Sequence, residues 1–160
     1  MTLSTEREAY HILDQLQISF CRIDHKPMPT VKHYDVQLPG PQVKNLLLKD
    51  KQKQFYFVII LEDKMLDLKQ LSKKLKTSRL SFATSEELNL LLGLQPGTVT
   101  PIALHHDYKQ KIRVVIDKEI DQDSTIGIHP NVNTTTLIIN YQDLERYFVW
   151  SFHQPIYLSL

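Results

Sequence analysis

The chain has 160 residues, of which 42% are hydrophobic and 23% charged, and its formal net charge is +1. This length fits one domain with a sizeable core, and the composition is that of an ordinary soluble globular protein. No apolar stretch approaches the roughly 20 residues of a membrane span, and the near-neutral charge does not by itself point to nucleic acid.

The N-terminal segment predicts an amphipathic helix. Thr5 and Glu8 form a candidate capping box, and apolar residues recur at helical spacing behind them, which predicts a helix over about residues 5–16. The segment lacks the charged flank and apolar run of a signal peptide. We therefore expect a cytoplasmic protein.

A strand and a hairpin are predicted next. Residues 18–24 have a strand pattern, and 43–48 and 54–61 are two apolar runs joined by KDKQK. The second run, QFYFVIIL, has no polar alternation, so we expect it to be buried on both faces. The single cysteine, Cys21, excludes an internal disulfide and a multi-cysteine metal site.

Positive charge gathers in the middle of the chain. Residues 44–79 carry ten basic and four acidic side chains, a net charge of +6 against −5 for the remainder. Two interpretations stay open: a solvated helix face and hairpin tip, or a surface that faces phosphate groups.

The second half predicts further helices and strands. Asp67 and Thr84 can cap two helices, the second of which ends at Gly93. The other expected elements are strands at about 102–105, 112–116, 126–129 and 134–139, a helix at about 141–151, and a C-terminal edge strand. We predict a single α/β domain over residues 1–160, with a mixed, mostly antiparallel sheet surrounded by helices.

Standard catalytic motifs are absent from the sequence. It has neither a G-x-S-x-G nucleophile motif nor a phosphate-binding G-x-x-x-x-G-K-[ST] loop. His105 and His106 are neighbours on a predicted strand, where they would point to opposite faces and could not share a metal. The other histidines lack metal-ligand spacing, so we expect no metal site and no cofactor.

Three positions remain at which polar or loop-forming residues stand unusually, beside or between the predicted strands. Lys44 and Asn45 stand at the head of a core strand, a Gly-x-x-x-Pro loop spans 97–101, and His129-Pro130 lies between two strands. From the residues alone, Lys44 also fits a solvated strand-end lysine, the loop an ordinary helix-to-strand connection, and His129 a structural histidine.

Taken together, these placements resemble a known family. LDQLQISFCRIDHKPMPTV (13–31), KNLLLKDKQKQFYFVIILEDKMLDLKQLSKKL (44–75), RLSFATSEELNLLLGLQPGTVTPIAL (79–104) and IHPNVNTTTL (128–137) are similar to a free-standing form of the editing (insertion) domain of bacterial prolyl-tRNA synthetase. The third stretch resembles the alanine-specific branch of these aminoacyl-tRNA deacylases, the prolyl-tRNA editing proteins, more than the cysteine-specific branch.

The resemblance implies trans-editing hydrolysis of mischarged tRNA(Pro). A synthetase pocket built for proline cannot strongly exclude alanine, because a missing methylene is worth only about 1–3 kcal/mol, so a second site must hydrolyse the error. The family route is substrate-assisted: a ribose hydroxyl of the terminal adenosine helps to place the attacking water, without a covalent intermediate. Cys-tRNA(Pro) deacylase and a non-catalytic module that binds the tRNA acceptor end are the alternatives. Prolyl-tRNA synthetase is a candidate protein partner.

The resemblance also implies roles for single residues. Lys44 would contact the terminal phosphate or the ester end of the tRNA, and Asn45 the ribose or the neighbouring loop. Backbone groups of the loop, which begins at Gly97, would receive the α-amino group and carbonyl oxygen, and His129 would limit the pocket. The further expected substrate-binding residues are Thr98, Val99, Thr100, Pro101, Phe20, Ile23, Thr30, Val31 and Pro130.

Overall fold

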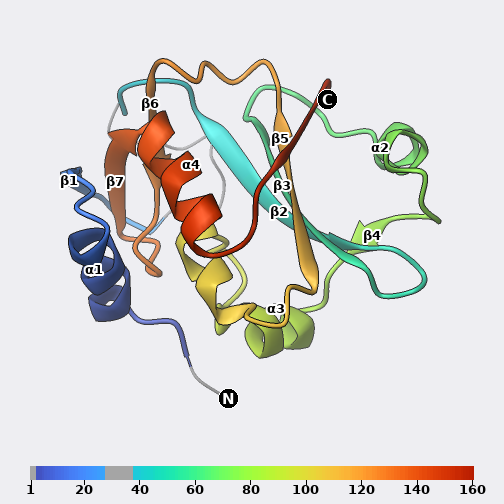
Figure 1. Cartoon of the computed structure of the whole chain (residues 1–160), viewed down its shortest axis with the longest axis horizontal. Coiled ribbons are helices and arrows are strands. Elements are labelled where there is room, and N and C mark those ends of the chain that lie inside the picture. Colours follow the sequence, from blue (N-terminus) through green and yellow to red (C-terminus); the bar gives the residue numbers. More distant parts are fainter. Residues whose placement is uncertain (1–2, 28–37) are drawn as a thin grey trace.

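A computed structural model describes residues 3–27 and 38–160. Within these residues the chain forms four α-helices, one 3₁₀ helix and eight strands (Figure 1). In chain order they are α1 (Glu6–Gln15), β1 (Cys21–Asp24), β2 (Val43–Lys49), β3 (Phe55–Leu61), α2 (Leu68–Leu75), β4 (Ser81–Phe82), α3 (Ser85–Leu92), η1 (Pro101–His106), β5 (Ile112–Asp117), β6 (Thr125–Ile128), β7 (Thr135–Asn140), α4 (Tyr141–Trp150) and β8 (Ile156–Leu158).

The strands divide into two sheets. One has the order β4-β2-β3-β5-β8, with β2 antiparallel to both β3 and β4 and with β5 parallel to both β3 and β8. The other is antiparallel, in the order β1-β7-β6. In Figure 1, α4 crosses in front of the space between the two sheets. The prediction of a mixed, mostly antiparallel α/β domain is confirmed.

One apolar core joins both sheets. It takes side chains from β3 and β5, from β6 and β7, and from α1, α3, η1 and α4, so the two sheets belong to a single domain. A smaller cluster lies on the opposite face of the five-stranded sheet, where Leu71 of α2 covers Leu48 and Val58. Because β3 separates the two clusters, its residues 55–60 are all buried, as the absence of polar alternation predicted.

The helix caps form where the sequence placed them. Thr5 accepts a hydrogen bond from the Glu8 amide, and Thr84 forms a complete capping box with Glu87. Gly93 ends α3 with a φ of 64°, a left-handed conformation that glycine adopts without steric cost.

Two predicted strands are corrected. The strand expected at 102–105 is wrong: Pro101 fixes the first turn of a 3₁₀ helix, and the Tyr147 hydroxyl accepts from the His105 amide and donates to the Ile102 carbonyl. These backbone groups therefore find their partner on α4 instead of on a neighbouring strand. The strand expected over 18–24 forms only from Cys21 to Asp24.

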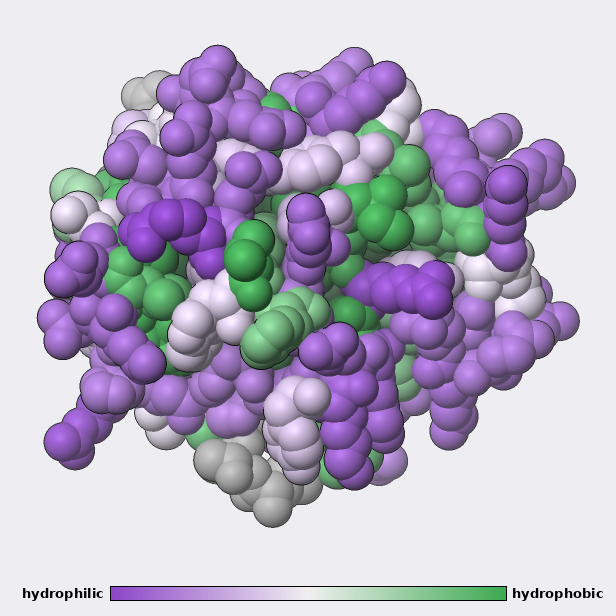
Figure 2. Space-filling model, viewed as in Figure 1, coloured by the Kyte–Doolittle hydropathy of each residue, from purple (hydrophilic) through white to green (hydrophobic). Residues whose placement is uncertain are grey.

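The surface is mostly polar, with one face that differs. Figure 2 shows apolar side chains across the middle of the face that carries α4. Near the end of α4, Val149, Phe152 and Ile156 are exposed. No helix in the described part of the chain is long and apolar enough to cross a membrane.

Candidate active site

Three segments that are distant in the sequence meet beside the start of β2. Asn45 Nδ2 donates a hydrogen bond of 3.0 Å to the Val99 carbonyl, which ties β2 to the loop before η1. Thr100 Oγ1 donates a hydrogen bond of 2.7 Å to the His129 carbonyl, which ties the same loop to the segment after β6. Thr100 is completely buried, so this second contact is protected from water. We call the meeting point of Asn45, the loop 97–101 and His129 the junction.

His129 is held in one tautomer at the junction. Its Nδ1 lies 2.9 Å from the Thr135 carbonyl, and because a carbonyl can only accept, Nδ1 carries the proton and Nε2 is the acceptor. Burial lowers the pKa of His129, and the nearby His25 lowers it further, while the bond to Thr135 opposes the shift. The imidazole is therefore neutral at neutral pH.

His25, which the sequence analysis did not select, stands beside His129. The two rings lie 6.1 Å apart, edge to face. His25 Nδ1 donates to the Lys26 carbonyl, and His25 Nε2 accepts from the Thr136 hydroxyl at 2.8 Å. His25 directly follows the predicted strand 18–24, but nothing in its spacing to His129 indicates the contact, because 103 residues and the pairing of β1 with β7 separate them.

Two buried polar atoms near the junction lack partners within the described residues. They are Asn45 Oδ1 and Asn131 Oδ1. Each amide group has its nitrogen fixed: Asn45 Nδ2 donates to Val99, and Asn131 Nδ2 donates to the Thr5 carbonyl at 2.9 Å. A buried acceptor without a partner costs about 1–3 kcal/mol, so Asn45 Oδ1 has an unused capacity to accept a hydrogen bond within the described structure.

The loop 97–101 is exposed at its first residue and buried at its last two residues. Gly97 is exposed with a φ of 88°, and a Cβ at that position would meet no other atom within 4 Å. The requirement for glycine there is conformational and not steric. Thr98, Thr100 and Pro101 are buried and Val99 half-buried, so the loop turns from solvent into the core before η1 begins.

Lys44 lies on the other face of the sheet. Neighbouring side chains of a strand point to opposite faces, so Asn45 shares its face with Leu47 of the main core, and Lys44 shares its face with Leu46 and Leu48 of the smaller cluster. Lys44 Nζ donates a 2.5 Å hydrogen bond to the Lys64 carbonyl. It forms no ion pair with any carboxylate in the part of the chain described here.

The other predicted pocket residues divide into three groups. Ile23 pairs with Thr136 in the sheet and Pro130 is buried, so both lie next to the junction. Phe20 does not: it precedes β1, packs against Tyr10 with ring centroids 5.5 Å apart, and lines a surface pocket of α1. Thr30 and Val31 fall outside the described residues.

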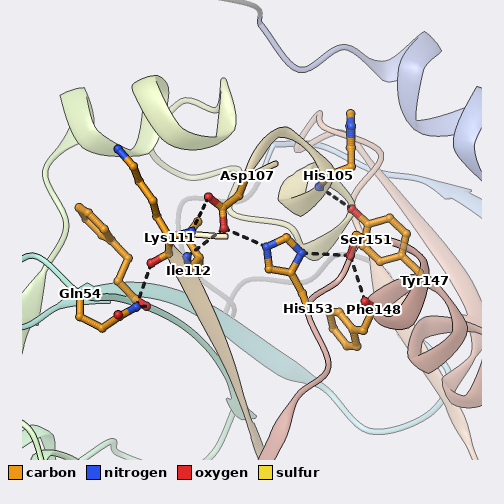
Figure 3. A network of polar contacts seen from close by, with 10 residues as sticks. Gln54, His105, Asp107, Lys111, Ile112, Tyr147, Phe148, Ser151 and His153 are labelled. Atoms are coloured by element: carbon orange, nitrogen blue, oxygen red, sulfur yellow. Dashed lines mark hydrogen bonds and ion pairs between the residues drawn. The ribbon is translucent and has the colours of Figure 1, made fainter. Parts of the chain in front are cut away.

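A Ser-His-Asp arrangement, which the motif search missed, lies elsewhere (Figure 3). His153 Nε2 is 2.9 Å from Asp107 Oδ2, and His153 Nδ1 is 3.2 Å from Ser151 Oγ. The side chains of His153 and Asp107 are only 1% and 2% exposed. Asp107 also accepts from the amides of Lys111 and Ile112. We call these contacts the buried network; they fasten the end of α4 to the start of β5, and the side chains of His153 and Asp107 are closed to solvent.

His105 and His106 lie on the same side of η1, and not on opposite faces as a strand would place them. The 3₁₀ helix brings the two rings together, with centroids 4.2 Å apart. Together with Glu8 they place three ligand atoms within 4.8 Å of one another.

Comparison with known proteins gives a consistent result. A family model described as "Aminoacyl-tRNA editing domain" matches residues 25–147. The prolyl-tRNA editing protein ProX of Acetoanaerobium sticklandii is 34% identical over 150 residues, 91% of this chain and 92% of that protein. Prolyl-tRNA synthetase associated domain-containing protein 1 of Danio rerio is 33% identical over 96% of this chain and 86% of its own length.

A solved structure shares the fold. A crystal structure described as a candidate trans-editing enzyme for prolyl-tRNA synthetase superposes with a TM-score of 0.71, covering 99% of this chain and 98% of that one. At 15% sequence identity this likeness concerns the arrangement of helices and strands.

Proposed function

The chain belongs to the aminoacyl-tRNA editing domain family, and we propose that it hydrolyses the aminoacyl ester of mischarged tRNA(Pro) in trans, with Ala-tRNA(Pro) as its substrate. ProX, a prolyl-tRNA editing protein, matches nearly the whole chain, which supports this substrate class. We take residues 1–160 as one editing domain, because Ala9 and Ile12 of α1 belong to the main core although α1 precedes the matched range 25–147.

The observation that carries the proposal is Asn45 Oδ1, which has no hydrogen-bond partner in the part of the chain that the structure describes. It is buried at the point where β2 meets the loop 97–101, with its amide nitrogen already engaged by Val99. The terminal ribose and the α-ammonium group of an aminoacyl-adenosine are both hydrogen-bond donors. One of them would fill the vacant acceptor position and fix the ester beside the loop.

Hydrolysis at this place requires water and no protein nucleophile. A water oxygen attacks the ester carbonyl carbon, helped by the free ribose hydroxyl, and the negative charge moves to the carbonyl oxygen. Backbone N–H groups of the loop 97–100 would stabilise that oxyanion, apart from that of Thr98, which already donates to the Gln95 carbonyl. The bond to the ribose oxygen then breaks, that oxygen takes up the proton, and alanine and tRNA are released. On this proposal EDTA leaves the initial rate unchanged.

His129 suits the role of a pocket wall. It is neutral, its ring is fixed by Thr135 and flanked by His25, and its backbone is tied to Thr100. A rigid wall excludes larger aminoacyl groups more effectively than a mobile one, because a steric clash is then not relieved by side-chain movement. Its neighbour Pro130 and the nearby Ile23 would complete this side of the pocket.

Lys44 is proposed to contact the phosphate backbone from the opposite face of the sheet. β4 pairs with β2 only at Leu48 and Lys49, so within the described residues the strand edge at 43–46 is unpaired on that side. A single strand can cross this edge, with its amino acid beside Asn45 and its phosphate beside Lys44. The same face carries the exposed lysines of α2 and the turn after it, which are Lys69, Lys73, Lys74 and Lys76.

Release of labelled amino acid from charged tRNA(Pro) tests the proposal. We expect Ala-tRNA(Pro) to be hydrolysed faster than Cys-tRNA(Pro), and Pro-tRNA(Pro) to survive. A faster reaction with Cys-tRNA(Pro) would assign the protein to the cysteine-specific activity. An ester that stays intact while the tRNA binds would make the chain a binding module for the acceptor end.

A modified substrate tests the route. Ala-tRNA(Pro) that ends in 2′-deoxyadenosine carries the ester on the 3′ oxygen but lacks the neighbouring hydroxyl. If that hydroxyl helps to place the water, this substrate binds and is not hydrolysed. Equal rates for the two substrates would show that the protein alone activates the water.

A further inference from the structure

A second cluster of chemically reactive side chains lies between α1 and η1. Glu8 Oε1 of α1 is 2.6 Å from His105 Nε2 and 2.6 Å from His106 Nε2. The three side chains are only 26%, 19% and 17% exposed, and each presents one ligand atom to the same point. None of them belongs to the junction.

These short contacts are not ordinary hydrogen bonds. Glu8 Oε1, His105 Nε2 and His106 Nε2 are all buried, and none has a hydrogen-bond partner within residues 3–27 and 38–160. The two contacts are ion pairs only when a histidine ring is protonated. Three converging buried atoms without partners are rare in folded proteins, because each costs about 1–3 kcal/mol unless something binds there.

The ligand set suits a borderline-soft divalent metal. Two imidazoles and one carboxylate hold Zn²⁺ in known sites, with bonds of about 2.0–2.2 Å and a fourth position for water. Tetrahedral ligands stand about 3.3 Å apart, so each ring needs to move outward by less than about 1 Å.

We propose that Glu8, His105 and His106 bind one divalent transition metal ion of the Zn²⁺ class, with water completing the coordination. The inference depends on these three residues alone and is independent of the proposed hydrolysis. No ligand comes from the junction, so the ion would not touch the substrate.

The position of the site indicates what the ion does. η1 begins at Pro101, directly after the loop of the junction, and Tyr147 holds it from α4 through Ile102 and His105. A metal at Glu8 would hold η1 from α1 as well. The ion would then add bonds between α1 and η1, whose Glu8, His105 and His106 side chains already touch, and it would stabilise the fold without touching the substrate.

Zn²⁺ binding to the purified full-length chain, first stripped with EDTA and then dialysed, tests the proposal. We expect one equivalent to bind by calorimetry. At a free Zn²⁺ concentration of a hundred times Kd, the melting temperature should rise by about 5–10 °C. Mg²⁺ at the same concentration should have no effect, because it prefers oxygen ligands. A chain that binds no Zn²⁺ would overturn the inference.

Matched variants locate the ion. Glu8→Gln and His106→Gln should abolish the rise in melting temperature on addition of Zn²⁺. His11→Gln and Asp14→Asn, which alter exposed residues of the same helix, should keep it. A rise that survives in both Glu8→Gln and His106→Gln would place the metal elsewhere and refute the site.

A measurement on the unmodified chain avoids dependence on the folding of variants. The chain has seven histidines, and long-range ¹H–¹⁵N spectra resolve their ring nitrogens. Zn²⁺ should shift the Nε2 signals of two histidines, assigned as His105 and His106, and leave that of His11 in place. Shifts confined to other histidines would contradict the proposal.

Discussion

The junction and the buried network each combine a histidine with other polar side chains, but they differ in whether every polar group has a hydrogen-bond partner. In the buried network, Asp107 uses both carboxylate oxygens, and His153 has a partner on each ring nitrogen. At the junction, Asn45 has an amide nitrogen that donates to Val99 and an oxygen that has no partner among residues 3–27 and 38–160. A network whose polar groups are all paired contributes to stability, and an unpaired buried acceptor can still bind a donor. Residue type alone would select the buried network, because the serine, histidine and aspartate resemble a catalytic triad, whereas our proposal places the reaction at the junction.

The largest expected effect concerns the buried network. Asp107→Ala removes the partner of two amides and of the buried His153, and breaking such a network costs about 3–5 kcal/mol. For a chain of this size the melting temperature should fall by roughly 6–20 °C. Thermal unfolding followed by circular dichroism measures this, and the rate of deacylation per folded molecule should stay the same.

Asp121→Ala is the matched control. Asp121 is exposed, and within the described residues its carboxylate accepts only from the amide of Asp123, so its loss should change stability by less than about 0.5 kcal/mol. If Asp107→Ala and Asp121→Ala behaved alike, the buried network would not hold the fold.

Lys44→Ala tests the phosphate side of the proposed site. Losing a charge-assisted contact of about 1.5–3 kcal/mol corresponds to a drop of roughly 10- to 150-fold in kcat/KM. Lys44→Arg should recover only part of the activity, and the salt dependence should become shallower because one cation fewer meets phosphate. Deacylation at two salt concentrations measures both effects.

Lys51→Ala controls for loss of positive charge, because Lys51 is exposed in the turn between β2 and β3. Unchanged kinetics in a folded Lys44→Ala variant would make Lys44 a solvated strand-end lysine.

His129→Ala tests the pocket wall. Removing the ring should relax selectivity toward larger aminoacyl groups by about 1 kcal/mol, or roughly fivefold in the ratio of kcat/KM values. Ala-tRNA(Pro) and Pro-tRNA(Pro) compared side by side give this ratio. A variant of normal stability that keeps the wild-type preference would exclude His129 as a wall.

The smallest expected effect is on the pH dependence of stability. Folding lowers the pKa of His129 below its ordinary value of 6.5, so between the two values the unfolded chain binds more protons. The contribution of His129 to stability is therefore complete above pH 6.5 and is lost as the pH falls through the folded-state pKa. Urea unfolding between pH 7.5 and pH 5 should show a weaker decrease for His129→Gln than for the wild type. An identical decrease would mean that His129 titrates alike in both states.

Periodicity and caps predicted much of the fold. The hairpin of β2 and β3, the helices at Thr5, Asp67 and Thr84, and the burial of β3 follow from local patterns that tertiary packing did not override. Residues 102–105 form part of a 3₁₀ helix and not the predicted strand, because their backbone partner, the Tyr147 hydroxyl, lies 42 to 45 residues away in the sequence. That error also hid the cluster of Glu8, His105 and His106.

The junction was only partly predictable. Asn45, the loop and His129 stand out in the sequence by their positions, but their proposed roles came from a resemblance, since their contacts join residues 29 to 54 positions apart. The placement of Lys44 and Asn45 on opposite faces follows from strand alternation and needed only that argument. His25 and the buried network could not be found, because ring contacts between distant segments leave no periodic signal in a sequence.

Asn45→Ala and Ser151→Ala in one assay test the central claim most directly. If water attacks the ester at the junction, Asn45→Ala should lower kcat/KM for Ala-tRNA(Pro) about 10- to 100-fold, in line with the loss of a buried hydrogen bond and of loop positioning. Ser151→Ala should keep the wild-type rate. A loss of activity in Ser151→Ala approaching the roughly 10⁶-fold loss seen when a catalytic serine is removed, with Asn45→Ala unaffected, would show that the buried network is the active site and contradict the account.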